Sequence, residues 1–356
     1  MQDYLPHRKH GTLTTRLVCA VVFLLFSFSW LYFFQADVIA LAQHVLSGGQ
    51  TSYDRTVGAV LLTLALWLLQ LGVYALIRLS RRTHALTYLP SMLLLAVISD
   101  IPGDIHLAGY SFRHWLWVVP LALVVWAFAV WLSKQLLPFE NDEKQPTGLF
   151  SRRMWLNLLQ MAAMMLLVVG MSNTDAVFHF KAHAEMALLQ GDTAEATRVG
   201  QQSNETDVSL TMLRLHALAR EGQLGDRLFS YAVVGRSQDM LPLKGSRWHL
   251  LMMPEDSIWK AFGLRPIFKM TTAYYLKTLL NDTVSRPMVA DYVLCGHLLD
   301  RDLQAFVRDL PVFYPDSLPL PRYYEEALQL ARHPVQTEQQ RAEENPGSYA
   351  FYFFKK

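Results

Sequence analysis

Long runs of apolar residues occur only in the first half of the chain, and the last of them ends at Met171. A bilayer core of about 30 Å needs roughly 20 apolar residues in a helix that rises 1.5 Å per residue. The runs predict membrane spans near residues 17–34, 57–77, 85–99, 115–132 and 154–171. Ala40 and Ala42 have the spacing of a signal-peptidase site, but the apolar run before them is longer than a signal core, so we expect the first span to be retained.

The segment from Ala85 to Ile98 is shorter than the others, contains Pro90 and is closed by Asp100. The positive charges of the loops indicate whether it crosses the membrane. Arg and Lys are frequent before the first span, after the second and before the last, and sparse in the two remaining loops. Loops rich in positive charge and loops poor in it alternate along the chain only if the short segment crosses the membrane. The positive-inside rule then predicts five spans, with the N-terminus in the cytoplasm and the chain after Met171 outside.

Composition supports this division and excludes some functions. Of the 356 residues, 52% are hydrophobic and 17% are charged, whereas an average soluble domain has about 25% charged residues. The net charge of +2 and the lack of a basic stripe in the sequence argue against nucleic-acid binding. Cys19 and Cys295 lie far apart in the sequence, so no disulfide is expected and Cys295 is interpreted as a buried core residue.

After Asn173 the pattern changes to shorter helices that end at Gly or Asp turns. Ala184, Gly191 and Ala196 have the spacing of a helical hairpin, and Gly191 lies 31 residues before Gly222. This pattern resembles degenerate tetratricopeptide repeats, whose period is 34 residues. An irregular helical domain is the alternative. The fold class expected is all-α: a polytopic helical membrane bundle over residues 1–172 and a soluble, tetratricopeptide-like domain over residues 173–356.

The C-terminal tail is rich in aromatic residues, from Ser348 to Lys356. An end of this composition is costly to leave in water, so we expect it to pack on the domain, with insertion into the membrane interface as the alternative.

The first external loop has one candidate catalytic residue, Asp37, which is followed by an apolar helical pattern and by Gly48-Gly49. The loop is similar to the first external loop of membrane glycosyltransferases that use lipid-linked sugars. That resemblance implies that the Asp37 carboxylate orients a metal ion or deprotonates an acceptor. However, Val38 stands where such enzymes have a second acid. A solvated acid beside a helix on the membrane surface is the simpler interpretation.

The second external loop contains Asp100, Asp104 and His106 around Pro102-Gly103. Two carboxylates and an imidazole within seven residues are able to bind a divalent cation if the loop folds back. Pro-Gly flanked by Asp is equally typical of an ordinary turn. These residues are the candidate catalytic and metal-binding set together with Asp37, and no motif in the sequence indicates a bound cofactor.

Two passages, Gln35–Gln70 and Leu318–Ala331, together with the aromatic terminus, resemble a family of bacterial multi-span membrane proteins. The resemblance implies a Gram-negative inner membrane, an N-terminal region of several spans and a periplasmic, tetratricopeptide-like C-terminal region. It implies no activity.

The sequence therefore predicts a scaffold in the bacterial inner membrane that presents a periplasmic helical domain to an envelope protein partner. The alternative is a glycosyl- or phospho-group transferase that acts on a lipid-linked substrate through the external-loop carboxylates. A transporter is a third hypothesis, which the lack of charged residues within the spans disfavours.

Overall fold

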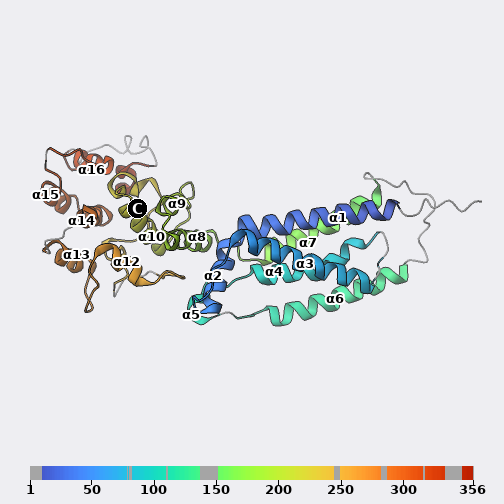
Figure 1. The fold of residues 1–356 in the computed structure, drawn as a ribbon. Helices are drawn as coiled ribbons and strands as arrows, with labels where there is room; N and C mark the ends of the chain where they lie inside the picture. Colours follow the sequence, from blue (N-terminus) through green and yellow to red (C-terminus); the bar gives the residue numbers. More distant parts are fainter. Residues whose placement is uncertain are drawn as a thin grey trace, which may run out of the picture. The chain divides into compact units, whose positions relative to one another are not determined.

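The all-α class is confirmed, because helices and turns account for the structure and the described residues include no β-strand. The computed structural model describes residues 10–77, 79, 82–109, 111–136, 151–243, 249–281, 287–315, 317–332 and 347–355. The chain divides into two compact units, Met1–Thr174 and Asp175–Lys356 (Figure 1).

The first unit is a bundle of helices that run side by side (Figure 1). Its elements are α1 (His10–Ser29), a π-helix (Trp30–Phe34), α2 (Ala36–Ser47), α3 (Arg55–Ile77), a 3-10 helix (His84–Tyr88), α4 (Leu89–Ser99), α5 (Ile105–Ala108), α6 (Trp115–Leu136) and α7 (Arg152–Met171). Among the described residues, four helices are long and apolar enough to cross a membrane: Leu13–Phe34, Arg55–Ile77, Trp115–Gln135 and Arg152–Met171. They correspond to four of the predicted spans.

The predicted span at residues 85–99 is the exception, because it forms a shorter apolar helix, His84–Ser99. Its main part, α4, contacts α3, α6 and α7. Leu95 and Ala96 are fully buried, and the Ser91 hydroxyl donates to the Leu66 carbonyl oxygen at 2.8 Å. Neighbouring helices thus cover one face of α4, whereas Leu94 on another face is 42% exposed.

The C-terminal ends of α1, α4 and α7 lie together at one end of the bundle, which we call the Asn173 end. The Trp30 indole N–H donates to the Ser99 hydroxyl at 3.0 Å. The Asn173 backbone N–H donates to the Ser99 carbonyl at 3.2 Å, and the Asn173 side-chain amide donates to the Ile101 carbonyl at 2.7 Å. The three helices therefore end together.

The opposite end, which we call the Asn157 end, holds the start of the short segment. The Ala85 backbone N–H donates to Asn157 Oδ1 at 2.8 Å, and the hydroxyls of Thr83 and Ser133 are 2.7 Å apart. The segment His84–Ser99 thus runs from one end of the bundle to the other. Five 3-10 residues and eleven α residues rise about 26 Å, which is close to the hydrocarbon thickness of a bilayer.

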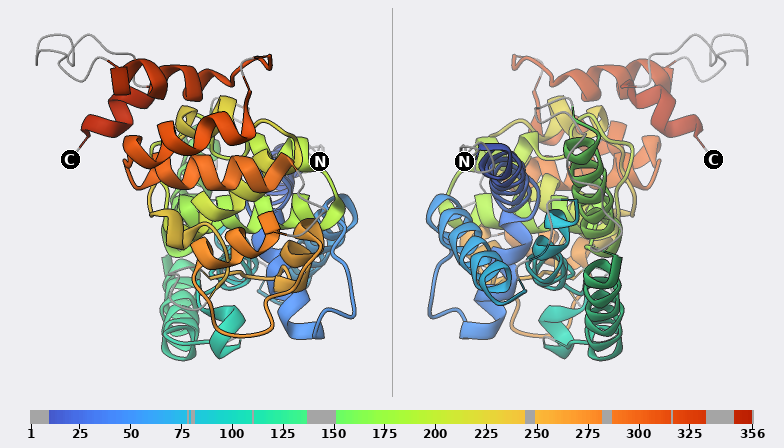
Figure 2. Two further views of the ribbon diagram at one scale, coloured as in Figure 1. Left: turned by 90° about the vertical axis from the view of Figure 1, so that its left-hand side faces the viewer. Right: turned by 90° about the vertical axis from the view of Figure 1, so that its right-hand side faces the viewer.

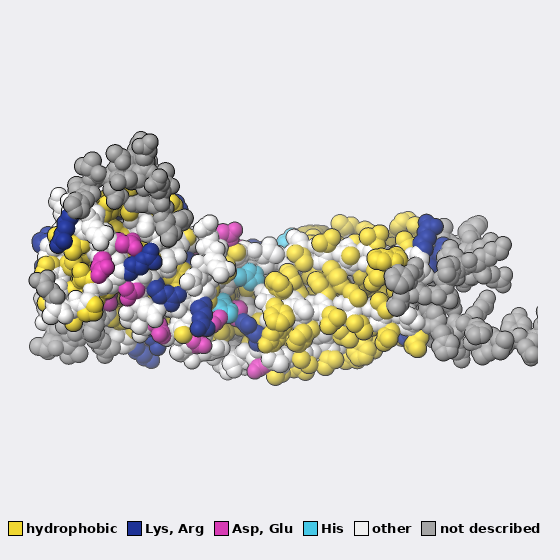
Figure 3. Space-filling view, turned by 90° about the horizontal axis from the view of Figure 1, so that it is seen from above, with side chains coloured by type: hydrophobic (Ala, Val, Ile, Leu, Met, Phe, Trp, Pro, Cys, Tyr) yellow, Lys and Arg dark blue, Asp and Glu magenta, His cyan; other side chains and the backbone are white. Residues whose placement is uncertain are grey.

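The outer surface of the bundle is apolar. Figure 3 shows hydrophobic side chains over its visible face. Leu68 on α3, Trp117 on α6 and Leu166 on α7 are 63%, 82% and 72% exposed. Such a surface is stable in lipid and not in water.

The second unit contains many shorter helices: α8 (Ala176–Gln190), α9 (Thr193–Arg198), α10 (Val208–Arg220), α11 (Leu224–Arg227), 3-10 turns at Leu228–Ser230 and Ser237–Asp239, α12 (Glu255–Phe262), α13 (Thr272–Asn281), α14 (Pro287–Leu299), α15 (Leu303–Phe313), α16 (Arg322–Arg332) and α18 (Tyr349–Phe354). Their apolar faces meet in one core that includes Leu213, Tyr292 and Phe306. The segment from Met240 to Lys277, which has prolines at positions 242, 254 and 266, contains α12 and part of α13.

The residues that suggested repeats lie at helix-packing positions. Ala184 and Ala196 are buried, and Gly191 has a φ of 80° after the last residue of α8. However, α9 has six residues and α11 has four, against 15 in α8 and 13 in α10. The second helix of each expected hairpin is therefore short, and the tetratricopeptide-like interpretation stays a prediction.

The aromatic tail packs on the second unit, where α18 contacts α16 (Figure 2). The hydroxyls of Tyr349 and Tyr352 donate to the carbonyl oxygens of Leu298 and Leu299 at 3.2 and 2.9 Å. The Arg301 guanidinium donates to the carbonyls of Tyr352 and Lys355. The terminus is thus held by hydrogen bonds as well as by ring packing.

Candidate functional site

Asp37, the candidate acid of the first external loop, lies in the first turn of α2. The Arg55 guanidinium donates to both of its oxygens, at 2.8 and 2.9 Å. Val38 and Leu41 on the same helix are fully buried, because α2 packs against α3 and α4. A single guanidinium nitrogen, Nη2 of Arg55, therefore bridges both oxygens, and this ion pair competes with a metal ion for the carboxylate.

Asp100 follows the last residue of α4, at the Asn173 end. Its Oδ2 atom accepts a hydrogen bond from the Trp115 indole N–H at 2.8 Å and lies 3.6 Å from Nε2 of His114. The carboxylate therefore holds the first residue of α6 beside α4.

Asp104 is half exposed and forms an ion pair with Arg113 at 2.5 Å. Arg113 has a φ of 41°, in the left-handed region that side chains other than glycine rarely adopt. Strain of this kind costs about 1–3 kcal/mol and often accompanies function. The turn directs the guanidinium toward Asp104 immediately before α6 begins.

His106 lies in α5 and is partly buried. α5 contacts α2, so the helices that carry Asp37 and His106 are neighbours. Across the described part of the chain, no three His, Cys, Asp or Glu side chains are arranged to hold a metal ion. Asp37 and Asp104 instead accept hydrogen bonds from Arg side chains, and Asp100 accepts one from Trp115.

An apolar groove lies between α4 and α6, next to these loops, with a volume of about 470 Å³. The α4 wall is formed by Pro90, Leu93, Leu94 and Val97. The opposite wall is formed by Phe112, Trp115, Leu116, Val119, Pro120 and Leu123. We call this feature the α4–α6 groove. Its volume is in the range of small-molecule sites, about 300–1,000 Å³.

The groove was missed in the sequence, although its periodicity is present there. The α4 residues stand at positions i, i+3, i+4 and i+7, as do Leu116, Val119, Pro120 and Leu123. That spacing places each set on one helix face. The sequence does not reveal these two faces, because nearly all the remaining positions in the two helices are also apolar.

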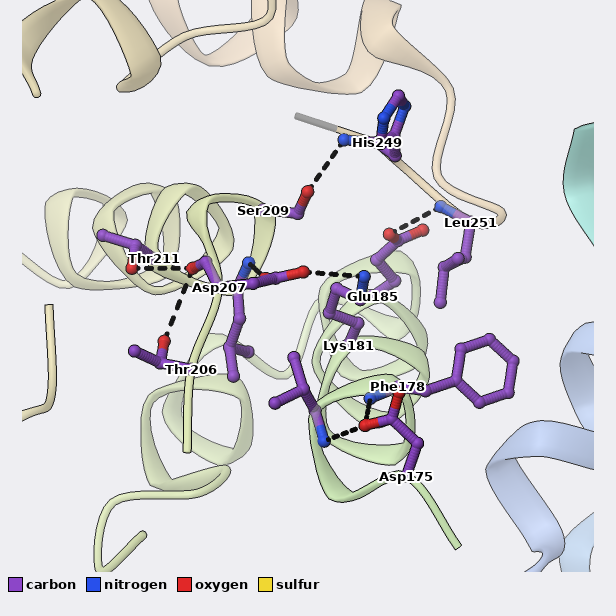
Figure 4. A network of polar contacts seen from close by, with 12 residues as sticks. Asp175, Phe178, Lys181, Glu185, Thr206, Asp207, Ser209, Thr211, His249 and Leu251 are labelled. Carbon is purple, nitrogen blue, oxygen red and sulfur yellow. Dashed lines mark hydrogen bonds and ion pairs between the residues drawn. The ribbon is translucent and has the colours of Figure 1, made fainter. Parts of the chain in front are cut away.

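A buried polar network fixes the start of the second unit (Figure 4). Glu185 on α8 has no exposed surface. Its carboxylate accepts the backbone N–H groups of Leu251, Met252 and Met253 at 2.8, 2.7 and 2.8 Å. Burial raises the pKa of Glu185, while the three amides and Lys181 act in the opposite direction. The network attaches an irregular segment to α8 and is structural.

A second buried acid, Asp291 on α14, lies in the core of the same unit. Its Oδ1 atom accepts the hydroxyls of Tyr314 and Tyr324 at 2.7 and 2.9 Å, and Tyr324 lies 3.5 Å from the Cys295 sulfur. Burial raises the pKa of Asp291 and of the Cys295 thiol. Cys295 is fully buried, as expected, and it and Cys19 are both free thiols.

The loop of residues 265–270 exposes apolar side chains. Ile267 is 88% exposed and Phe268 is 60% exposed. The loop lines a cavity of about 270 Å³ together with Pro242, Leu243, Glu255 and Trp259. This site has no signal in the sequence, because residues 265–270 form a short irregular stretch that contains Pro266 and no known motif.

Comparison with known proteins gives one finding about family. The profile of a family of unknown function (DUF6057) matches residues 265–349. The match agrees with the expected resemblance to a family without a known activity. It begins at the loop of residues 265–270 and contains Leu318–Ala331. No curated protein and no solved structure matches the chain.

Proposed function

We propose that the protein is a membrane-anchored scaffold whose second unit binds a protein partner through the loop of residues 265–270, which we call the docking loop. The observation that carries the proposal is the pair of exposed apolar side chains, Ile267 and Phe268, beside a cavity. Exposed apolar groups next to a pocket are typical of interaction sites. The pairing of the external-loop acids with Arg and Trp favours this function over catalysis.

The partner's chemistry follows from the residues around the loop. The Phe268 and Tyr274 rings lie 6.1 Å apart, which extends the apolar surface onto α13. Arg265 and Lys269 flank the apolar pair, and the exposed Arg265 is 3.3 Å from Asp256. We therefore propose a partner segment with an apolar anchor and acidic neighbours.

We further propose five membrane crossings, with the second unit on the opposite face from the N-terminus, in the periplasm of a Gram-negative cell. The support is the path of His84–Ser99 between the two ends of the bundle, together with the alternation of positive loops. A reporter that is active only outside the cytoplasm, fused after Lys355, should be active. Activity of a cytoplasmic reporter at the same position would contradict the topology.

The docking loop can be tested by site-specific photo-crosslinking in the full-length protein in cells. A photoreactive phenylalanine analogue at position 268 should give one adduct of discrete mass, and Ile267→Asp should abolish it. Val312 on α15 is 74% exposed and does not line the cavity, so the same analogue at position 312 is the matched control. An identical adduct pattern at both positions would refute the docking loop.

A second candidate function, group transfer on a lipid-linked substrate, is favoured by the α4–α6 groove beside Asp100. In that case Asp100→Asn and Asp104→Asn would abolish the cellular phenotype at normal abundance. For a scaffold, the phenotype and the crosslinked adduct should both persist.

A further inference from the structure

We propose that the α4–α6 groove is a binding site for one acyl chain of a phosphatidylethanolamine molecule, with the lipid phosphate on Arg113 and the lipid ammonium on Asp104. This inference concerns the first unit and is independent of the docking loop.

The walls of the groove are held apart by fixed contacts, so it is more than a gap between loosely placed helices. The Trp115 indole N–H is fixed on Asp100, and the Trp126 indole N–H donates to the Leu86 carbonyl at 2.8 Å. The groove lies between these two attachments. Only 11% of the α6 window is buried, the lowest fraction of the four candidate spans in the described chain, so much of α6 remains accessible to lipid.

The length and depth of the groove fit an acyl chain in one leaflet. Along α6 it extends from Trp115 to Leu123, eight residues or about 12 Å. Half of the hydrocarbon core is about 15 Å. The groove begins at the Asn173 end, where Trp115 has the position of an interfacial aromatic residue. A chain entering from the headgroup region would therefore fill it to near the bilayer centre.

The charges at the entrance of the groove select the headgroup. Arg113 directly follows the wall residue Phe112, and its side chain is 52% exposed. The guanidinium is a preferred ligand for phosphate, and the N-terminus of α6 adds a positive dipole. Asp104 supplies a half-exposed carboxylate beside the guanidinium. A cation and an anion side by side complement a headgroup that carries a phosphate and an ammonium.

The backbone conformation of Arg113 suggests a variant that tests the role of the guanidinium. Its φ of 41° is a conformation that glycine adopts without strain. Arg113→Gly therefore removes the guanidinium while favouring the same turn. Loss of binding in this variant would report the missing charge and not a misfolded loop.

The test measures lipid retained by the full-length protein in nanodiscs that contain equal amounts of phosphatidylethanolamine and phosphatidylglycerol. After extraction into detergent, bound lipid is counted by native mass spectrometry. The wild type should retain about one phosphatidylethanolamine per chain. Leu94→Trp, which fills the groove, should reduce retention at least fivefold, and Arg113→Gly should reduce it about tenfold, as expected for one charged hydrogen bond.

Leu68→Trp on α3 is the matched control, because Leu68 is lipid-exposed but lies outside the groove. It should retain lipid like the wild type, and Phe268→Asp in the docking loop should do so too. Equal loss in Leu68→Trp would show ordinary surrounding lipid and overturn the site. Preferential retention of phosphatidylglycerol or added polyprenyl phosphate, or full retention by Arg113→Gly, would also overturn it.

Discussion

The three amides bound by Glu185 allow a prediction that depends on one side chain. In Glu185→Gln, the shape is kept, but one of the two acceptor oxygens becomes an NH₂ donor. In the wild type, Leu251 donates to Oε1 while Met252 and Met253 donate to Oε2. A glutamine oxygen at the second position keeps at most two of these bonds. The amide of Leu251 then faces another donor.

The magnitude follows from these bonds. Leu251, Met252 and Met253 are all at least 94% buried, so water does not readily replace the lost acceptor. One unsatisfied buried amide costs about 1–3 kcal/mol, and the remaining bonds lose the strengthening that a charge gives. We expect local opening of this segment to become easier by about 3 kcal/mol, or roughly 100-fold.

Hydrogen–deuterium exchange, measured by mass spectrometry on the full-length protein, tests this directly. A peptide that covers residues 249–254 should exchange roughly 100-fold faster in Glu185→Gln, while peptides from α14 change little. Glu195→Gln on α9 is the control, because Glu195 is 43% exposed and pairs with His183 and Arg198. Unchanged protection of residues 251–253 would refute the assignment of Glu185 as their acceptor.

Three further predictions concern the second unit. Burial raises the pKa of Asp291, so the contribution of this residue to stability is greatest below its unfolded-state pKa and is lost as pH rises through its folded-state pKa. Asp291→Asn should flatten this pH dependence of the free energy of unfolding, measured with urea at pH 4 to 8, and an unaltered slope in the variant would contradict the prediction. Burial lowers the pKa of His216 to about 4, so the free energy of unfolding of the wild type should fall by about 3 kcal/mol as pH drops from 6.5 to 4. His216→Leu should remove that loss, and a variant whose stability falls in parallel with that of the wild type would contradict the role of His216. Arg301 has a φ of 60° and binds the tail, so Arg301→Gly and Arg301→Ala should both speed amide exchange in α18 about tenfold, while only the alanine variant also retains backbone strain, about 1 kcal/mol; a tail that stays as well protected in both variants as in the wild type would contradict the contact.

The membrane helices were predictable because their signal is composition over a fixed length. Four candidate spans coincide with the apolar runs, and their ends differ from the predicted ones by a few residues. The segment at His84–Ser99 was ambiguous for a physical reason. A helix covered by other helices can be short and can contain polar residues such as Thr87 and Ser91, because its neighbours satisfy them.

The chemistry of the two loops that carry Asp37, Asp100 and Asp104 was only partly predictable. Asp100, Asp104 and His106 were predicted to form one candidate site because they are close together in the sequence. It did not reveal the Arg55 partner of Asp37 or the Trp115 partner of Asp100, since these pairs are 18 and 15 residues apart and depend on how the helices pack. Buried acids such as Glu185 were also missed, because a single Glu in an alanine-rich helix looks like a surface residue.

The π-helix at Trp30–Phe34 has a consequence for chain length. Its wide turn is closed by the Gln35 N–H donating to the Trp30 carbonyl, five residues earlier, at 3.0 Å. Such a turn accommodates one residue more than an α-helix does. Deleting a single residue here would remove the extra residue and restore ordinary α-helical winding, so the residues that follow would keep their direction. Asp37 would then still face Arg55. This span should therefore tolerate a one-residue deletion at the π-helix better than a deletion within α1, which would rotate everything that follows by about 100°.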